Sequence, residues 1–565
     1  MSEEKKMTGY PSIDKPWLKY YSEEAINTPL PECTIYEYLL ENNKDHLDDI
    51  AIIYFNRKIK YKQLFDAIDR AASVFSSFGV AKGDIVMICT LNTPEMIYCA
   101  YALNKIGAIA DFEYPTLSED ELYSTIKALN AKAVVMLDLF RKKYKDITNH
   151  TQNCLFISPC SSFSFTMKAV YKLKGKNVID TLTPLIKNAK ADNIAQEHKH
   201  DQPAIIVHTG GSTGVPKGVM LNDDSFNAIA FQYKLSGMEY KRQDRILHCI
   251  PPFHAYGFSV GVHMPLSLGM TICMSIKIDN ETTVELFSKY KPAHFVVGGS
   301  HVSAIIKDRR IIKSDLSHLK TIAIGGAAIN ESFETEANDF LISHNAKSKL
   351  IVGYGMTETC ATVCTNMDKC SKVGTVGIPL PKVSIKIIDV DSGKELGYNE
   401  TGELYISSPT LMMKYYSNDE ETSNTLLNDH SGIWVKSGDV ASVDEDGFVT
   451  IKGRIKRIYA TKDLETGYIF KIYPTYIENT ILKCKSIDSC AVICKKDKNH
   501  IHIAEAFIKL NKDSNANASI TEIKNICLQH LPPYSQPVKY HVIESVPMTP
   551  VGKTDYEQLE KMSEE

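Results

Sequence analysis

Short apolar runs alternate with amphipathic stretches through the first three-quarters of the chain. The runs at 51–55 and 84–89 are each followed by a segment of helical period, near 62–79 and 94–106. Apolar runs of this length between helical segments are typical of strands buried on both faces, so the pattern predicts an α/β body. The alternation resumes downstream with strand-like runs at 204–209, 246–250, 270–276, 295–299, 321–326 and 349–355.

The pattern changes after residue 370, where strand-like runs come closer together. The turn sequences Asp391-Ser392-Gly393 and Glu445-Asp446-Gly447 separate pairs of such runs and predict hairpins. The last part of the chain has its own mixed pattern and is long enough for a separate small domain. We therefore predict an α/β fold with three parts: a large N-terminal α/β domain (1–370), a β-rich subdomain of that body (371–455) and a small mobile C-terminal α+β lid domain (456–565).

Charge and composition favour a soluble, cytoplasmic protein with a small-molecule partner. The 64 basic and 68 acidic residues give a formal net charge of -4, so no overall positive field exists to hold nucleic acid or an anionic membrane. The 14 cysteines form no CxxC pair, which fits free thiols in a reducing compartment. The first residues lack the apolar core of a signal peptide, and no stretch reaches the roughly 18 apolar residues of a transmembrane segment.

The most informative motif is TGGSTGVPKG at 209–218, directly after an apolar run. Its glycines let backbone N–H groups turn inward, its hydroxyls add donors, and Lys217 adds a positive charge, a combination that suits a polyphosphate. The motif is not a Walker A loop, because a proline separates Gly214 from Lys217 and the required spacing fails. Taken alone, the string could also be a polar loop whose lysine faces water.

Five further motifs follow this loop in a fixed order. They are YGMTE (354–358), GEL (402–404), WVKSGD (434–439), GRIK (453–456) and PMTPVGK (547–553). With this set the chain resembles the adenylate-forming superfamily, which includes acyl-CoA synthetases, nonribosomal peptide adenylation domains and beetle luciferases. The resemblance spans roughly residues 30 to 560 and implies two reactions: ATP activates a carboxylic acid as an acyl-AMP with release of pyrophosphate, and a thiol then takes the acyl group.

The resemblance also implies which residues bind MgATP. Asp439 would accept hydrogen bonds from the ribose hydroxyls, Tyr354 would stack on adenine, and Glu358 would bind Mg²⁺, a hard cation that prefers oxygen ligands. Without the motifs, Glu358 would be read as a surface carboxylate, and Asp439 with Arg454 as a surface ion pair. The full nucleotide-binding set implied is Thr209, Gly210, Gly211, Ser212, Thr213, Gly214, Lys217, Gly325, Gly326, Ala327, Tyr354, Gly355, Thr357, Asp439, Arg454 and Lys553.

By the same resemblance, catalysis falls to Lys553, Lys217, Thr357 and His254. Lys553 would bridge the substrate carboxylate and the α-phosphate, although a lysine so near the end of a chain is otherwise an ordinary tail residue. His254 would lie beside the acyl group, with a satisfied core histidine as the alternative reading. The expected acyl pocket comprises His254, Tyr256, Val297, Gly298, Gly299 and Gly325.

The stretch HAYGFSV (254–260) bears on the substrate, because adenylation domains for α-amino acids usually carry an aspartate near this point to pair with the ammonium group. No acidic residue is present here, which favours a fatty or aryl acid. Cys360, Cys364 and Cys370 lack the paired spacing of a structural zinc site.

Coenzyme A is the expected thiol acceptor, and an acyl carrier protein is the alternative. In the family a glycine usually precedes the P-x-x-I-E motif and leaves space for pantetheine, whereas this chain has Ile469 there. Rotation of the C-terminal domain about a hinge at Lys456 would separate the two half-reactions. We therefore expect an acyl-CoA synthetase, with a stand-alone adenylation enzyme as the second reading and a non-catalytic or luciferase-like relative as the third.

Overall fold

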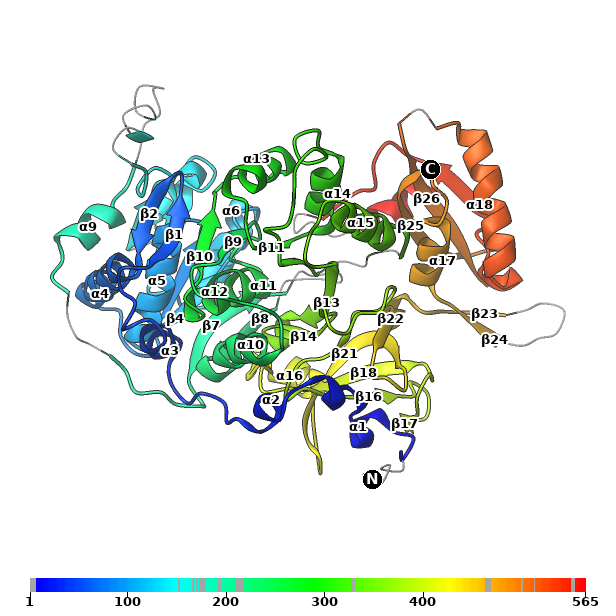
Figure 1. The fold of residues 1–565 in the computed structure, drawn as a ribbon, viewed down its shortest axis with the longest axis horizontal. Helices are drawn as coiled ribbons and strands as arrows, with labels where there is room; N and C mark the ends of the chain where they lie inside the picture. The colour runs from blue at the N-terminus through cyan, green and yellow to red at the C-terminus, as the bar shows by residue number, and fades with distance from the viewer. Residues whose placement is uncertain are drawn as a thin grey trace.

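The computed structural model describes most of the chain. It contains two large sheets, a smaller sheet and a terminal domain (Figure 1). It describes residues 7–150, 153–164, 167–168, 171, 179–191, 195–209, 217–326, 329, 331–462, 469–498, 501–512, 514–549 and 554–564. The α/β class predicted from the apolar runs is confirmed.

The first large sheet has nine strands: β1 (Ile50–Tyr54), β2 (Arg57–Lys60), β9 (Arg245–His248), β10 (Thr271–Met274), β11 (His294–Val297), β12 (Thr321–Ile324), β13 (Leu350–Met356), β14 (Ala361–Thr365) and β15 (Ile378–Pro379). Their order is β15-β14-β13-β12-β11-β9-β10-β1-β2. The six strands from β13 to β1 run parallel, and antiparallel strands close both edges. The predicted run at 295–299 ends earlier as a strand, because its glycines begin the next helix.

The second large sheet has seven strands: β3 (Ile85–Cys89), β4 (Ile109–Phe112), β5 (Ala133–Leu137), β6 (Cys154–Ile157), β7 (Pro203–His208), β8 (Gly218–Asn222) and β19 (Lys414–Tyr415). Their order is β19-β8-β7-β4-β3-β5-β6. Strands β7, β4, β3, β5 and β6 are parallel, while β8 returns antiparallel to β7 and accepts β19 on its other side. The chain segment between β7 and β8 is the glycine-rich motif.

A layer of helices lies between the two large sheets: α3 (Ile35–Glu41), α4 (Tyr61–Ser77), α5 (Pro94–Lys105), α10 (Asp223–Leu235) and α12 (Met264–Ser267). Helix α12 packs on β10 of the first sheet, α10 packs on β8 of the second, and the two helices pack on each other. Every residue of α5 is buried, as expected for a helix covered on all sides. A hydrogen bond of 2.7 Å from Asn104 on α5 to Asp223 on α10 ties the layer together.

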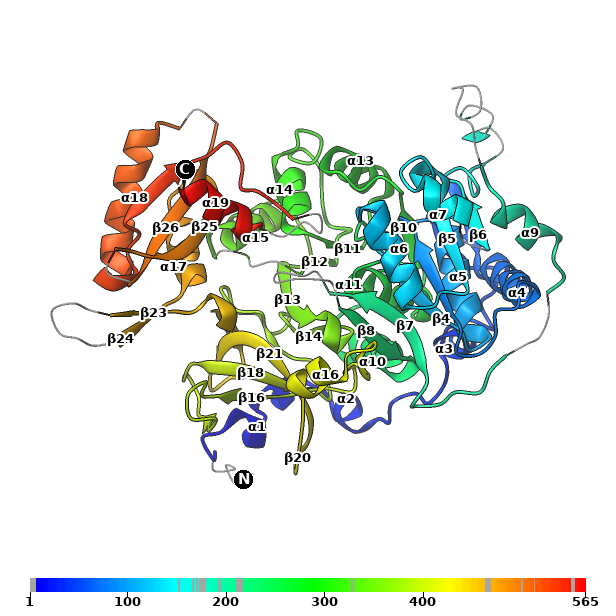
Figure 2. The same ribbon diagram turned by 180° about the vertical axis from the view of Figure 1, so that it is seen from behind.

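Helices also cover the outer face of each large sheet. On the first sheet they are α13 (Asn280–Tyr290), α14 (Gly299–Lys307) and α15 (Glu331–Ser343); on the second they are α6 (Glu119–Ala128) and α7 (Lys145–His150). Figure 2 shows α6 and α7 in front of the second sheet. Each outer layer has its own hydrophobic cluster, separate from the large central one. The strands are therefore buried on both faces, which explains why they read as continuous apolar runs.

A third, antiparallel sheet forms the predicted β-rich part from β16 (Ser384–Ile388), β17 (Glu395–Leu396), β18 (Gly402–Ser407), β20 (Leu426–Asp429), β21 (Gly432–Val443) and β22 (Val449–Arg454). Both predicted hairpins are present, between β16 and β17 and between β21 and β22. Two short strands of the range 371–455 belong elsewhere, since β15 and β19 pair with the large sheets.

The first residues that the structure describes pack on this third sheet. Helix α1 (Pro11–Asp14) lies against β16. Ser12 donates a hydrogen bond of 2.5 Å to Glu395, and Tyr398 donates one of 3.0 Å to Asp14. Trp17 is fully buried.

The remaining chain forms a small α+β domain (Figure 1). It contains the hairpin β23 (Tyr459–Lys462) and β24 (Ile469–Ile472), and the sheet β25 (Ile487–Lys496), β26 (His502–Leu510) and β27 (Lys539–Val542). Helices α17 (Pro474–Ile481), α18 (Ala516–His530) and α19 (Tyr556–Glu564) pack around the sheet. Within the described part of the chain, no helix has both the length and the apolar character needed to cross a bilayer.

Candidate active site

The two described ends of the glycine-rich motif are joined by strand pairing and hydrogen bonds. His208, the last residue of β7, pairs with Gly218, the first of β8. Just inside this pair, the Thr209 N–H donates to the Lys217 carbonyl over 2.9 Å, and the Lys217 N–H donates to Thr209 Oγ1 over 3.1 Å. The chain therefore leaves and re-enters the sheet at one point. Of the predicted phosphate-binding residues, Gly210, Gly211, Ser212, Thr213 and Gly214 lie outside the described residues.

Lys217 is held by residues from the segment 414–425. Its Nζ lies 2.6 Å from Glu421 Oε1 on α16 (Asp419–Thr425) and 4.5 Å from the centre of the Tyr415 ring on β19. The hydrogen bond from Lys217 lowers the pKa of Glu421. Both side chains of the pair remain partly exposed, at 33% and 38%. The lysine is thus preplaced at the motif by a carboxylate that a bound phosphate would have to displace.

Tyr415 also contacts the predicted magnesium ligand. Its hydroxyl donates a hydrogen bond of 2.6 Å to Glu358 Oε1, and the Glu358 side chain is buried. Burial and the nearby Glu358 charge raise the pKa of Tyr415, so its hydroxyl stays protonated. Lys217 and Glu358, which are far apart in sequence, therefore contact the same tyrosine, Lys217 at its ring and Glu358 at its hydroxyl.

The YGMTE turn is fixed by its glycine. A Cβ on Gly355 would lie only 1.5 Å from the Ala361 carbonyl oxygen, so no larger residue fits between β13 and β14. Thr357 and Glu358 follow in a short 3-10 turn that ends at Cys360, whose φ is +56°. The close approach of the two strands places Glu358 beside Tyr415.

Tyr354, Asp439 and Arg454 form a second cluster. The Tyr354 hydroxyl donates a hydrogen bond of 2.5 Å to Asp439 Oδ2, and Arg454 Nε lies 2.9 Å from Oδ1. Asp439 and Arg454 are direct partners on β21 and β22, and Arg454 Nη1 also donates to the Ser437 carbonyl over 2.9 Å. The three residues predicted to bind adenosine are thus in contact.

Only part of the predicted acyl pocket comes together. A Cβ on Gly325 would lie 3.9 Å from the Tyr256 ring and 3.5 Å from the Gly353 carbonyl oxygen, so these residues line one place. Gly298 and Gly299 begin α14. Val297 is fully buried in the cluster on the outer face of the first sheet, whereas Tyr256 packs on the central cluster. The Val297 side chain therefore does not face Tyr256.

His254 precedes helix α11 (Ala255–Phe258) and lies beside aromatic rings. Its ring centre is 5.7 Å from that of Tyr114 and 5.0 Å from that of Phe253. Gly257 follows within α11, where a Cβ would come within 2.0 Å of the Pro251 carbonyl oxygen. The segment from Pro251 to Gly257 is therefore tightly folded. His254 lies within it, directly before α11.

The predicted hinge lies between two anchored arginines. Lys456 sits in the 3-10 turn Ile455–Arg457 and is exposed. Arg454 is bound to Asp439 on the N-terminal side. On the other side, Arg457 donates hydrogen bonds of 2.8 Å to Glu478 and 2.9 Å to the Val492 carbonyl, both in the small domain. A rotation at the predicted hinge would therefore fall on the residues between the two anchored arginines.

Two further predicted residues, Ala327 and Lys553, lie outside the described residues. Gly326 is described and has φ +82°, a conformation that favours glycine. The segment that carries Lys553 is bounded by Met548 and Thr554, which form an isolated antiparallel bridge.

Sequence reasoning missed several residues that the fold brings to the site. Tyr415 and Glu421 lie outside the motifs and carry no local signal, because their role depends on β19 reaching β8. Asp111, Glu113 and His208 form a buried cluster beside Thr209. His208 did carry a signal, because it lies in an apolar run predicted to be a buried strand, and Asp111 and Glu113 interrupt another apolar run.

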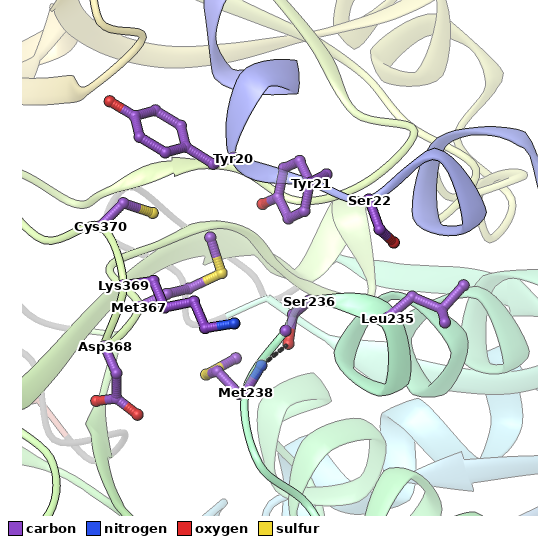
Figure 3. A pocket seen from close by; sticks show the side chains of 11 residues that line it. Tyr20, Tyr21, Ser22, Leu235, Ser236, Met238, Met367, Asp368, Lys369 and Cys370 are labelled. Carbon is purple, nitrogen blue, oxygen red and sulfur yellow. Dashed lines mark hydrogen bonds between the residues drawn. The ribbon is translucent and has the colours of Figure 1, made fainter.

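A cavity between Tyr20–Ser22, the end of α10 and the turn 367–370 is separate from these residues (Figure 3). It is lined by Tyr20, Tyr21, Ser22, Leu235, Ser236, Gly237, Met238, Met367, Asp368, Lys369 and Cys370. None of them is a predicted site residue.

Comparison with known protein families agrees with the motif order. The sequence profile of AMP-binding enzymes matches residues 39–416, and the profile of the AMP-binding enzyme C-terminal domain matches residues 476–553. The chain belongs to the AMP-binding enzyme family. As an AMP-binding enzyme it has both parts of the family architecture, the second of which includes Lys553.

Individual members of the family resemble the whole chain. It is 27% identical over 515 residues to 4-coumarate--CoA ligase-like 2 of Arabidopsis thaliana, covering 90% of this chain and 86% of the relative. It is 26% identical over 565 residues to a long-chain-fatty-acid--CoA ligase of Bacillus subtilis (strain 168), covering 95% and 96%.

Solved structures of AMP-binding enzymes share the fold. The anthranilate CoA ligase AuaEII in complex with anthranoyl-AMP matches with a TM-score of 0.82 at 20% identity, covering 94% of this chain and 98% of that chain. The o-succinylbenzoate coenzyme A synthetase (MenE) of Bacillus subtilis, in complex with ATP and magnesium ion, matches with a TM-score of 0.75 at 23% identity, covering 93% and 99%.

The Lys217–Glu421 pair generates a prediction for this AMP-binding enzyme. Glu421→Gln keeps the side-chain shape but removes the charge that competes with phosphate for Lys217. We expect the KM for ATP to fall about two- to fivefold, the range set by the modest strength of partly exposed ion pairs. Steady-state kinetics with varied ATP measure it. Glu420→Gln, an exposed neighbour on the same helix, is the control and should leave KM unchanged. An unchanged or higher KM in Glu421→Gln contradicts the competition.

Proposed function

We propose that this AMP-binding enzyme activates a fatty or aryl carboxylic acid as an acyl-AMP and transfers the acyl group to coenzyme A. The observation that carries the proposal is the meeting of Lys217, Tyr415 and Glu358, which joins the phosphate motif to the YGMTE motif. The names of the relatives support the acceptor, because both are CoA ligases. The enzyme is an AMP-forming acid–thiol ligase that uses ATP, Mg²⁺ and coenzyme A.

Adenylation brings a carboxylate to the α-phosphorus of ATP and expels pyrophosphate, so the site must hold several anionic groups together. In the proposal Thr209 and Lys217 hold the β- and γ-phosphates, and Thr357 holds the α-phosphate. Asp439 accepts the ribose hydroxyls, while Tyr354, which already bonds to Asp439, lies against adenine. The contact between these two side chains supports a shared adenosine site.

Mg²⁺ would be held by Glu358. The carboxylate is buried and oriented by the Tyr415 hydroxyl, which fits a hard cation that takes a carboxylate together with phosphate oxygens and water. When bound, the ion neutralises phosphate charge. The protein's own contribution is to fix the carboxylate before the nucleotide arrives.

The substrate class follows from the surroundings of His254 and Tyr256. The segment 254–260 has no acidic residue. Glu113, adjacent in sequence to Tyr114, whose ring lies beside His254, is already engaged by His208. Segment 254–260 therefore offers no carboxylate to pair with the ammonium group of an amino acid, and this supports a fatty or aryl acid.

A pyrophosphate-release screen tests the substrate class and the acceptor together. We expect fatty or aryl acids to give higher kcat/KM than every α-amino acid, and free coenzyme A to yield the acyl thioester. The products are identified by mass spectrometry, with reactions lacking acid or coenzyme A as controls. A clear preference for one amino acid contradicts the substrate class. Adenylation without thioester formation favours a carrier-protein acceptor instead.

Lys553 provides a test of the first half-reaction. Lys553→Ala should lower the adenylation rate at least about a hundredfold, the usual order for one positioned transition-state contact. Thioester formation from supplied acyl-AMP should survive much better, because that step does not need the bridging cation. Lys561→Ala, an exposed lysine on α19, is the matched control. Equal losses in both half-reactions would falsify the assigned role.

The hinge provides a test of domain rotation. Proline locks φ near −65°, a value that the 3-10 turn at Lys456 accepts but that removes the freedom to rotate. We expect Lys456→Pro to keep much of its adenylation and lose most thioester formation, measured as separate half-reactions. Lys456→Ala removes the same side chain without restricting φ and should keep both. Parallel losses in the proline variant, or none, count against rotation about this residue.

A further inference from the structure

Two carboxylates and one imidazole are buried together beside the phosphate motif. Asp111 on β4 and Glu113, two residues later, point to the same side, and His208 ends the neighbouring parallel strand β7. His208 Nε2 lies 2.7 Å from Asp111 Oδ1 and 3.4 Å from Glu113 Oε2. The three residues are at most 6% exposed. We call them the His208 triad. They lie at the carboxyl ends of parallel strands, where α/β folds bind ligands.

The triad carries a charge that depends on pH. Burial alone would lower the pKa of His208, but Asp111 and Glu113 outweigh it and raise the pKa to about 9. Burial also raises the pKa of Glu113 to about 7, against the opposing effect of His208. As pH rises through about 7, ionisation of Glu113 therefore adds one negative charge to the triad.

The triad is connected to both halves of the site. His208 immediately precedes Thr209 and pairs with Gly218 across the base of the motif. Tyr114 adds a second connection, since its N–H donates to Glu113 Oε1 over 2.8 Å and its hydroxyl donates to the His208 carbonyl over 3.1 Å. The same tyrosine ring lies beside His254. A change in the triad therefore reaches the phosphate motif through the backbone and His254 through one side chain.

We propose that the His208 triad positions the base of the phosphate motif and sets the electrostatic potential beneath the bound triphosphate, so that it tunes the affinity for ATP. The proposal rests on the assignment of residues 209–217 to phosphate binding. It makes His208, Glu113 and Tyr114 positioning residues that act through Thr209 and Lys217.

The sign of the pH dependence follows from the charges. As pH rises through about 7, Glu113 loses its proton, the triad becomes more negative, and affinity for a polyanion falls. Among the described residues, Glu121 on α6, Cys89 on β3, Tyr114 and Tyr144 also interact electrostatically with Glu113. Burial raises the pKa of the Cys89 thiol well above neutrality, so it stays uncharged in this range.

Glu113→Gln isolates this effect, because the amide keeps the shape and removes the ionisation. In the wild type, the dissociation constant of MgATP should rise on the order of tenfold from about pH 6 to about pH 8, the order expected for one added charge that acts through an effective dielectric constant of about 20. In Glu113→Gln that rise should be largely lost. Equilibrium binding of ATP at saturating Mg²⁺, without acid or coenzyme A, measures it. ATP is identical in both assays, so the difference between the proteins reports Glu113.

Glu95→Gln is the matched control. Glu95 is buried, its pKa is likewise raised to about 7 by burial, and it accepts a hydrogen bond of 2.5 Å from Ser162 away from the motif. It should keep the wild-type pH dependence. The proposal is overturned if Glu113→Gln retains that dependence, or if Glu95→Gln flattens it equally.

Two further variants test positioning. Tyr114→Phe removes only the bond to the His208 carbonyl and should raise the KM for ATP severalfold with a smaller change in kcat. His208→Gln/Asp111→Asn removes both members of the buried ion pair together and should weaken ATP binding, measured at about pH 6, where Glu113 is protonated. Unchanged ATP affinity in both folded variants overturns the positioning role. Lys217→Ala separates this inference from the proposed function. If Lys217→Ala also leaves ATP binding unchanged, the assignment of the motif to phosphate binding is wrong. If Lys217→Ala weakens ATP binding but the triad variants do not, only the role of the triad is rejected.

Discussion

The antiparallel return of β8 along β7 is the constraint on which the site depends. β7 lies parallel to β4 on one side, so its carboxyl end joins the edge where Asp111 and Glu113 stand. On its other side the His208–Gly218 pair closes the base of the phosphate motif. β8 then accepts β19, which delivers Tyr415 and leads into α16. One hairpin thus fixes the start of the motif, its lysine, and the carboxylate that holds this lysine.

Three basic side chains at the site each pair with a carboxylate of the protein. Lys217 pairs with Glu421, Arg454 with Asp439, and His208 with Asp111. The exposure of these pairs decides what each can do. The Lys217–Glu421 pair is partly exposed on both sides, so Lys217 can exchange its carboxylate for a phosphate at small energetic cost. Arg454 is 52% exposed, but its partner Asp439 is only 6% exposed, so that carboxylate is held in place. His208 is buried, and separating it from its partners would leave a charge unpaired at a cost of several kcal/mol. The Lys217 pair therefore suits ligand exchange, and the His208 pair suits a fixed scaffold.

The sequence predicted the strands and the motifs well because both depend on local information. Apolar runs marked β1, β3, β7, β12 and β13, and the two hairpin turns were read from their glycines. Long-range pairing was not predictable in this way. The contact of β19 with β8, and hence the role of Tyr415, arises only when chain segments nearly 200 residues apart become neighbours. The packing of Trp17 and α1 on the third sheet is the same kind of information.

Side-chain direction explains why Val297, which is predicted to line the acyl pocket, does not face it. Val297 was grouped with the acyl pocket because it precedes Gly298, yet strand alternation turns its side chain toward the outer cluster with Phe295. The triad shows the opposite case. Asp111 and Glu113 interrupt an apolar run, and charged residues are rarely fully buried unless paired, so the sequence held a signal whose partner, His208, only the parallel pairing of β4 with β7 reveals.

The predicted hinge lies between an arginine bound to the N-terminal body and an arginine bound to the small domain. Arg454 belongs to the N-terminal body through Asp439 and Ser437. Arg457 belongs to the small domain through Glu478, whose carboxylate also accepts the Val492 N–H. Across the boundary, Lys471 and Asp391 form an ion pair whose side chains are 43% and 75% exposed, and such pairs contribute little energy.

Gly453 lies at the boundary between the N-terminal body and the small domain. Its φ is +149°, and a Cβ there would lie 3.3 Å from Thr475 Oγ1 at the start of α17. The missing side chain lets the small domain approach the body without an interlocking contact. With firm anchors at Arg454 and Arg457 and weak contacts across the boundary, a rotation of the small domain would concentrate its backbone change at Ile455 and Lys456.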